Sequence, residues 1–230
     1  MARDGLDAGM SVDGERISSA PAAPLGAILA GGASRRFGSP KALATVAGHA
    51  IIERVGDALA EAVDRVVLIT NDPGLYAGLH LPTRPVERPG AGPLAGLQTA
   101  LRWAMDEGRA GALVVACDMP FLDPRALRLL VDGAATAASQ LDAAAFGAAG
   151  DGARPPLCAY FAVSCLPAVE RALAGEDRSV RALLASVATA WVPAAEVARF
   201  RDPAAMFFNV NTPDDLRHAE RIARELDERA

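Results

Sequence analysis

The sequence predicts an α/β domain of three layers, in which helices cover both faces of a mostly parallel β-sheet. Strand-like runs alternate along the chain with helix-like runs, and this alternation is typical of βαβ units with right-handed crossovers. The run over residues 25–30 is apolar without alternation, as in a strand that is buried on both faces. The chain has 230 residues, 51% of them hydrophobic, which is enough for one large core.

The first half of the chain alternates regularly between the two kinds of element. Strands are expected over residues 25–30, 65–70, 83–87 and 112–116, and helices over residues 51–62, 93–107 and 124–138. Residues 65–70 are rich in β-branched side chains, which favour a strand. Pro93 stands at a helix start, where its missing N–H costs little, and Asp123 is suited to cap the helix that follows it.

The second half is less regular. Strands are expected over residues 141–146, 156–161, 188–193 and 206–209, and helices over residues 164–174 and 177–186. A final helix begins after Thr212, which is suited to be its N-cap, and Pro213 takes the first helical position. Residues 24–230 are therefore expected to form a single domain. Residues 1–23 have no apolar periodicity and no apolar core of a secretion signal, so they are expected to form a flexible tail.

Composition argues against several classes of protein. The formal net charge is −5, so no general nucleic-acid partner is expected. No apolar run approaches the roughly 20 residues of a membrane span, so no membrane partner is expected either. The three cysteines are an odd count without a Cys-x-x-Cys pair, which predicts free buried thiols and a cytoplasmic location. A metal pair of Cys158 and Cys165 is disfavoured because no histidine lies near them in sequence.

A glycine-rich, cationic segment follows the first strand directly. Gly31 and Gly32 allow positive φ and close approach of a ligand, and their backbone N–H groups are suited to bind an anion. Arg35, Arg36 and Lys41 add positive charge, so the segment is suited to a polyphosphate. Neither the P-loop pattern nor Gly-x-Gly-x-x-Gly is present. The competing interpretation is a tight strand-to-helix turn with solvated arginines.

Polar residues follow two other expected strands. Asn71 comes after the second strand and Asp118 after the fourth, so both are expected at the sheet edge that carries the glycine-rich segment. A carboxylate at that place is suited to hold Mg²⁺, which prefers oxygen ligands. The competing interpretations are a turn or capping aspartate for Asp118, and for Asn71 a purely structural Asn-Asp-Pro-Gly turn.

The segment over residues 29–41 fits the pattern Leu-Ala-Gly-Gly-x-Ser-x-Arg-x-Gly-x-x-Lys, and three further motifs follow it. These are Gly-Pro-Leu-Ala-Gly over residues 92–96, Cys-Asp-x-Pro-Phe over 117–121 and Asn-x-Asn-Thr-Pro over 209–213. Together they resemble the molybdenum cofactor guanylyltransferase family, the MobA-like nucleotidyltransferases, over roughly residues 24–225. The resemblance implies a Rossmann-like fold of the nucleotide-diphospho-sugar transferase type.

The resemblance also implies an activity and a set of site residues. Members of this family transfer GMP from GTP to the terminal phosphate of molybdopterin and release pyrophosphate, with Mg²⁺ as cofactor. The implied catalytic residues are Arg36, Lys41 and Asp118, with Asp118 as the metal ligand. The implied GTP-binding residues are Leu29, Ala30, Gly31, Gly32, Lys41, Asn71, Glu87, Gly92 and Asp118. The implied acceptor-binding residues are Arg154, Arg178, Asn209 and Asn211.

One of these assignments depends on a departure from the family pattern, and another distinguishes two branches of the superfamily. Relatives carry an aspartate shortly before Gly-Pro-Leu-Ala-Gly, and Glu87 is the nearest carboxylate in a segment that looks shortened here. Cytidylyltransferases of the same superfamily tend to carry aspartate where Asn211 stands, which favours guanine. The competing interpretation of the Asn209–Asn211 segment is a strand that feeds the cap of the last helix.

The expected partners are GTP, molybdopterin or molybdenum cofactor, and transient contacts with molybdenum insertion proteins or molybdoenzymes. The first alternative is a CTP-dependent molybdopterin cytidylyltransferase. The second is another small-molecule nucleotidyltransferase, such as one for sugar 1-phosphates, although the chain is short for that. The third is a nucleotide-sensing partner without catalysis. The acceptor phosphate is already ionised at neutral pH, so no general base is assigned, and the three histidines are expected on the surface.

Overall fold

A computed structural model of the chain describes residues 23–31, 41–136, 141–147 and 157–228. The expected tail before Ala23 lies outside these ranges, as do four basic or glycine residues that the sequence singled out, namely Gly32, Arg35, Arg36 and Arg154.

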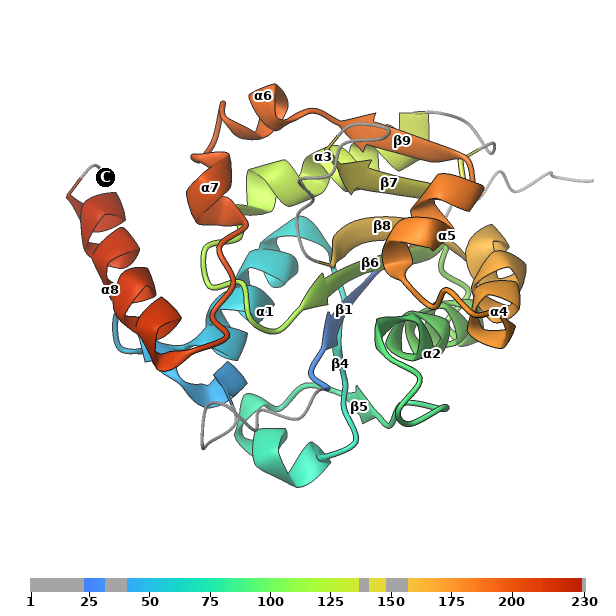
Figure 1. The fold of residues 1–230 in the computed structure, drawn as a ribbon, viewed down its shortest axis with the longest axis horizontal. Coiled ribbons are helices and arrows are strands. Elements are labelled where there is room, and N and C mark those ends of the chain that lie inside the picture. The colour runs from blue at the N-terminus through green and yellow to red at the C-terminus, as the bar shows by residue number, and fades with distance from the viewer. Residues whose placement is uncertain (1–22, 32–40, 137–140, 148–156, 229–230) are drawn as a thin grey trace, which may run out of the picture.

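The centre of the molecule is a seven-stranded sheet in the order β5-β4-β1-β6-β8-β7-β9 (Figure 1). Its strands are β1 (Leu25–Leu29), β4 (Val66–Ile69), β5 (Thr83–Arg84), β6 (Gly111–Ala116), β7 (Ala143–Phe146), β8 (Cys158–Ala162) and β9 (Thr189–Val192). β8 runs antiparallel to both of its neighbours, and the other pairs are parallel. A small antiparallel pair, β2 (Thr45–Val46) and β3 (His49–Ala50), lies apart from this sheet. The expectation of a mostly parallel sheet is confirmed.

Helices cover both faces of the sheet, as expected. One face packs against α1 (Ile51–Ala62) and α3 (Pro124–Thr136), and the other against α2 (Pro93–Asp106), α4 (Leu166–Ala174) and α5 (Val180–Ser186) (Figure 1). The last helix, α8 (Pro213–Asp227), joins the first core beside the β2–β3 pair. Successive residues of a strand serve opposite faces. On β6, Leu113 and Val115 belong to the first core, whereas Ala112 and Val114 belong to the second. This explains why the central strands read as continuous apolar runs.

Most expected elements are confirmed within a few residues, but the strand over residues 206–209 is wrong. Met206 ends a short helix instead, α7 (Pro203–Met206), and residues 207–210 belong to no strand. The cause is local capping. Asp202 accepts a hydrogen bond from the Ala204 N–H through Oδ1, which starts a helical turn and buries Met206 in the core.

Short elements between the main ones were not anticipated. They are η1 (Lys41–Leu43), η2 (Pro73–Leu79), η3 (Val163–Cys165) and α6 (Ala194–Val197), together with the β2–β3 pair. The helix expected from residue 177 begins at Val180, because the Ser179 hydroxyl caps it by accepting from the Ala182 N–H at 3.1 Å. α8 begins after Thr212 with Pro213 in its first turn, as expected.

Two further expectations can be checked within the described ranges. Cys117, Cys158 and Cys165 are buried and free, as expected. The three histidines, His49, His80 and His218, are exposed, as expected. None of the described helices is long and apolar enough to cross a membrane.

The strand order places one edge of the sheet at a switch point. β1 pairs with β4 on one side and with β6 on the other, all three in parallel, so their carboxyl ends meet at the same edge. From β1 the chain continues to β4 and β5 on one side and then crosses to β6 on the other side of β1. Ligands of α/β sheets bind beyond the carboxyl ends of the strands at such a switch point. Asn71 and Asp118 follow β4 and β6, so both lie at this edge, as the sequence predicts.

Candidate functional site

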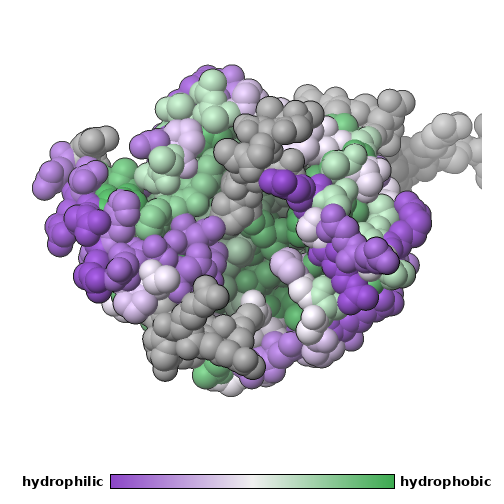
Figure 2. Space-filling view, viewed as in Figure 1, coloured by the Kyte–Doolittle hydropathy of each residue, from purple (hydrophilic) through white to green (hydrophobic). Residues whose placement is uncertain are grey.

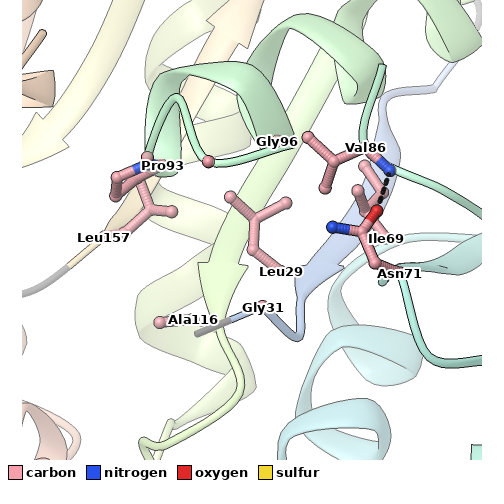
Figure 3. Close-up of a pocket in the computed structure, with 11 residues that line it drawn as sticks. Leu29, Gly31, Ile69, Asn71, Val86, Pro93, Gly96, Ala116 and Leu157 are labelled. Atoms are coloured by element: carbon pink, nitrogen blue, oxygen red, sulfur yellow. Dashed lines mark hydrogen bonds between the residues drawn. The ribbon is translucent and has the colours of Figure 1, made fainter. Parts of the chain in front are cut away.

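A cavity of about 520 Å³ opens at the carboxyl edge of the sheet, beside β1 and the start of α2. Its lining is mostly apolar and comes from Leu29, Gly31, Ile69, Asn71, Val86, Gly90, Gly92, Pro93, Gly96, Ala116 and Leu157 (Figure 3). Figure 2 shows a hollow with a hydrophobic floor in this part of the molecule. Its size and apolar lining are typical of a small-molecule site.

Glycines let the backbone approach the cavity closely. Gly90 and Gly92 have φ values of +83° and +76°, which side chains rarely adopt. Gly96 lies in the first turns of α2, where an added Cβ would stand 2.8 Å from Leu29 Cδ1. The helix therefore packs directly on the Leu29 side chain, which is part of the cavity wall. The N-terminus of this 14-residue helix faces the same cavity through Gly92 and Pro93 and favours an anion there.

The amide of Asn71 is fixed by one hydrogen bond. Its Oδ1 accepts from the Val86 N–H at 3.0 Å, so the oxygen is identified by its donor and the amide nitrogen faces the cavity (Figure 3). The structural turn after Asn71 is present as well, because the Leu75 N–H donates to the Asp72 carbonyl at 3.1 Å. The structural interpretation of this segment is therefore confirmed, and a nucleotide contact by Asn71 stays a prediction. A ligand in the cavity would meet one hydrogen-bond donor from Asn71.

An ionic cluster lies at the same edge of the sheet and joins three distant segments. Lys41 Nζ is 2.6 Å from Asp118 Oδ2 and 2.8 Å from Asn211 Oδ1. Lys41 begins η1, Asp118 follows β6 and Asn211 precedes α8. The Val210 N–H donates to the Asp118 carbonyl at 3.0 Å and ties the last two segments together. The Lys41 and Asp118 side chains are only 24% and 14% exposed.

A buried thiol with a raised pKa, that of Cys117, lies next to this cluster. Burial, and in second place the charge of Asp118, raise the pKa of Cys117 to about 12. At neutral pH the thiol is therefore protonated, and the thiolate is the nucleophilic form of cysteine.

The turn that carries Asn211 is held by Asp215, which the sequence did not single out for the site. Asp215 Oδ2 accepts from the N–H groups of Asn211 and Thr212 at 2.9 and 2.8 Å, and the Asp215 N–H donates to Thr212 Oγ1 at 3.1 Å. Burial acts to raise the pKa of Asp215, but the hydrogen bonds from Asn211 and Thr212 outweigh it and lower that pKa. The Thr-x-x-Asp spacing of a capping box was the available signal.

The oxygens at this place fit a hard divalent cation. Asp118 Oδ1 and Asn209 Oδ1 are buried and have no hydrogen-bond partner among the described residues. Asn209 precedes Val210, whose N–H contacts Asp118, so its backbone lies next to the cluster. Within the described ranges no group of three or more His, Cys, Asp or Glu residues is suited to a metal. A cation here would thus take Asp118 with amide oxygens, and oxygen ligands suit Mg²⁺.

Two predicted site residues lie apart from the cavity wall and the cluster. Glu87 pairs with Arg102, which also binds Glu170 at 2.7 Å, and the Glu87 N–H donates to Thr99 Oγ1 at 3.1 Å. Its neighbour Val86 lines the cavity in its place. Arg178 is exposed in the turn before α5, where its Nε donates to the Gly175 carbonyl at 3.3 Å. Their roles in binding GTP and acceptor stay predictions.

Comparison with known proteins places this geometry among related chains. Residues 26–191 match the family model of the MobA-like NTP transferase domain. A relative from Pelotomaculum thermopropionicum, named a probable molybdenum cofactor guanylyltransferase, is 36% identical over 86% of this chain and 92% of its own length. A molybdenum cofactor guanylyltransferase from Rhodobacter capsulatus is 37% identical over 87% of this chain and 96% of its own length.

A solved structure agrees with these relatives. The crystal structure of molybdopterin-guanine dinucleotide biosynthesis protein A from Archaeoglobus fulgidus is similar with a TM-score of 0.72 and 29% sequence identity. The similarity covers 87% of this chain and 99% of that one. Fold and sequence therefore point to the same group of proteins.

Proposed function

The chain belongs to the MobA-like NTP transferase family, and from this premise we propose that it transfers GMP from GTP to the terminal phosphate of molybdopterin. The observation that carries the proposal is the ionic cluster of Lys41, Asp118 and Asn211 at the sheet edge that also bears the 520 Å³ cavity. The cavity takes the nucleoside, and the cluster takes the phosphates and their cation. The names of the curated relatives support molybdopterin as the acceptor.

The reaction needs charge stabilisation more than it needs a protein nucleophile. An oxygen of the acceptor phosphate forms a bond to the α-phosphorus of GTP, and the bond from that phosphorus to the leaving pyrophosphate breaks. The acceptor phosphate is already ionised at neutral pH, so no side chain has to remove a proton. Mg²⁺, when bound, neutralises negative charge on the phosphates. Asp118 and Asn211 would hold the cation, and Asn209 has a buried oxygen next to them.

Lys41 and the segment before it supply the protein's own positive charge. The Lys41 ammonium is a compact charge on a flexible stem, suited to contact the triphosphate. Arg36 is assigned to the same task by the family pattern. Positioning and charge account for most of the catalysis in phosphoryl-group chemistry. Basic side chains of this type can therefore catalyse the transfer without a covalent nucleophile.

The names of the curated relatives favour guanine over cytosine. The cavity of about 520 Å³ has room for a nucleobase, and Asn71 presents a fixed donor to it. A base that leaves buried polar groups unpaired is rejected strongly, whereas a merely smaller base is rejected weakly. We therefore assign GTP as the nucleotide, with CTP as the competitor that the experiment must include.

The test is pyrophosphate release by the full chain with molybdopterin and Mg²⁺, with GTP and CTP compared under the same conditions. We expect kcat/KM to be higher for GTP and release to depend on the acceptor. Equal values or a preference for CTP would reassign the chain to cytidylyl transfer. No release with either nucleotide, from protein that is folded by circular dichroism, would refute nucleotidyl transfer to this acceptor.

The setting of the reaction is a further part of the proposal. Three free, buried cysteines suit a reducing compartment, which supports a cytoplasmic location. The product must then reach a molybdoenzyme, and transient contact with molybdenum insertion proteins or the recipient enzyme would serve this transfer.

A further inference from the structure

Two oxygens from distant segments converge on a single ammonium group. Lys41 Nζ lies 2.6 Å from Asp118 Oδ2 and 2.8 Å from Asn211 Oδ1, and the last two residues are brought together by the hydrogen bond from Val210 to Asp118. The other carboxylate oxygen, Asp118 Oδ1, is buried and has no hydrogen-bond partner among the described residues. Carboxylate and amide oxygens are what a hard divalent cation binds. The ammonium therefore stands where such a cation would bind.

The identity of the basic residue matters at this position. The chain contains 23 lysine and arginine residues, and Lys41 is the only lysine among them. Guanidinium groups are planar and spread their charge over a fork, whereas the lysine ammonium is a compact point charge on a flexible stem. Of the two, lysine is the better substitute for a metal ion between two oxygens, and it is also the one that can move away easily.

The two tasks of Lys41 exclude each other. An ammonium group has three N–H donors, and two of them are directed at Asp118 and Asn211. Contact with a triphosphate needs these donors, and a divalent cation on Asp118 would stand against a second positive charge. We propose that Lys41 is a displaceable counter-ion, which occupies the cation site without nucleotide and moves to the triphosphate when the metal and nucleotide bind. The second half of this inference rests on the proposed function.

The arrangement makes binding of the cation and of the nucleotide interdependent. Without nucleotide, a divalent cation must displace Lys41 from its two oxygens, and the ammonium loses both of these acceptors. With nucleotide, the triphosphate supplies new acceptors for the ammonium. The cation should therefore bind more tightly when the nucleotide is present, and by linkage the nucleotide should bind more tightly when the cation is present. A second effect is that Asp118 does not stay as an uncompensated carboxylate between turnovers.

The first experiment measures Mn²⁺ binding to the nucleotide-free full chain by electron paramagnetic resonance. Lys41→Met keeps the length of the side chain and removes its charge. We expect this variant to bind Mn²⁺ at least about tenfold more tightly than the unchanged chain, since like-charge repulsion and competition are both removed. The matched control Arg199→Met removes a positive charge from an exposed pair with Glu196 and should leave Mn²⁺ affinity unchanged.

Two results would overturn the inference. One is that Lys41→Met binds Mn²⁺ no more tightly than the unchanged chain. The other is that the double variant Lys41→Met, Asp118→Asn keeps the gain, which would place the ion elsewhere. Neither of these Mn²⁺ measurements uses GTP or molybdopterin. Failure of the guanylyl transfer assay would therefore leave the counter-ion inference untouched. Conversely, an active transferase with unchanged Mn²⁺ affinity in Lys41→Met would refute the counter-ion and leave the proposed function standing.

The second experiment follows Lys41 in the unchanged chain and does not depend on a variant that folds. Because the sequence has one lysine, acylation by acetic anhydride can be quantified at Lys41 by mass spectrometry, with the N-terminal amine as internal reference. We expect saturating Mn²⁺ to raise the acylation rate by releasing the ammonium. Addition of GTP with Mn²⁺ should lower it again. A rate that Mn²⁺ does not raise would contradict displacement.

Discussion

The Lys41 ammonium and the Asp118 carboxylate, 77 residues apart in the sequence, form an ion pair of 2.6 Å at the carboxyl edge of the sheet. Both side chains are largely shielded from water, with 24% and 14% of their surface exposed. Removing one partner of a shielded pair leaves an uncompensated charge, which is more costly than the pair itself is stabilising. Substitutions at the two ends of the pair should therefore have different consequences.

Asp118→Asn should nearly abolish turnover while the fold persists. The change keeps the shape of the side chain and removes the charge that would hold the cation. Loss of metal charge stabilisation costs several kcal/mol in a transition state, so kcat should fall more than about a hundredfold. Pyrophosphate release at saturating Mg²⁺ is the measurement.

The matched control for this prediction is Asp64→Asn. Asp64 is 62% exposed, pairs with Arg109 and precedes β4, so it lies at the opposite edge of the sheet. Its kcat should stay within about twofold of the unchanged chain because surface pairs contribute little. Near-normal turnover by Asp118→Asn would show that the reaction does not depend on the Asp118 carboxylate.

Gly96→Ala should weaken nucleotide binding without weakening the fold. The added Cβ would stand 2.8 Å from Leu29 Cδ1 and 3.1 Å from Cδ2, so the Leu29 side chain must turn toward the cavity that it lines. Alanine also has a helix propensity better than that of glycine by about 1 kcal/mol, which offsets part of the strain. We expect KM for GTP to rise several-fold, with a melting temperature close to that of the unchanged chain.

The control is Gly133→Ala in α3, where an added Cβ meets nothing within 4 Å. This change should raise the melting temperature by the helix-propensity gain and leave KM for GTP unchanged. The double change Gly96→Ala, Leu29→Ala should recover part of the lost affinity, because the smaller side chain makes room. If KM does not change in Gly96→Ala, the cavity beside Leu29 is not the nucleotide site.

Asp215→Asn should lower stability at neutral pH and much less in acid. The pKa of Asp215 is lowered in the folded chain by the N–H groups of Asn211 and Thr212, although burial acts in the opposite direction. A carboxyl group with a lowered folded pKa stabilises the fold above its unfolded pKa of about 3.9. The contribution is lost as pH falls through the folded pKa. We expect a loss of about 1 kcal/mol at pH 7, as for other helix caps.

Urea unfolding of Asp215→Asn and the unchanged chain at pH 7 and at pH 3 gives the measurement. Thr212→Ala is the control, because the Thr212 hydroxyl caps the same helix by accepting from the Asp215 N–H but does not titrate. The stability difference caused by Thr212→Ala should vary less with pH than the difference caused by Asp215→Asn. If the stability loss caused by Asp215→Asn does not vary with pH, the charge of Asp215 does not contribute to the stability of the fold.

Deletion of residues 1–22 should leave melting temperature and turnover unchanged. The segment has no apolar periodicity that would pack on the core. Ala23 must be kept, because its carbonyl accepts a hydrogen bond from Arg109 Nη1 at 2.9 Å. Thermal unfolding and pyrophosphate release of the shortened chain provide the check. A substantial drop in either quantity would show that the segment has a structural role.

The sequence by itself determined the parts of this protein that depend on local patterns. The apolar run of β1, the periodicity of α1 and the cap at Thr212 each indicate an element within a few residues. Two site residues could be placed as well. Asn71 and Asp118 follow parallel strands, and the carboxyl ends of parallel strands share an edge whatever the rest of the chain does.

Only the tertiary structure decided which side chains meet at that edge. Asn211 reaches Lys41 across 170 residues of sequence, and no periodicity or capping rule encodes that contact. It depends on the path of the chain from α7 to α8. The sequence pattern suggested a strand over residues 206–209, but the Asp202 cap starts a short helix that ends at Met206. Local signals report backbone preference and burial, whereas a contact between distant polar groups depends on the packing that brings their segments together. For this reason Lys41, Asp118 and Asn211 could each be predicted as site residues from the sequence. The contact of the Lys41 ammonium with both of the others could not.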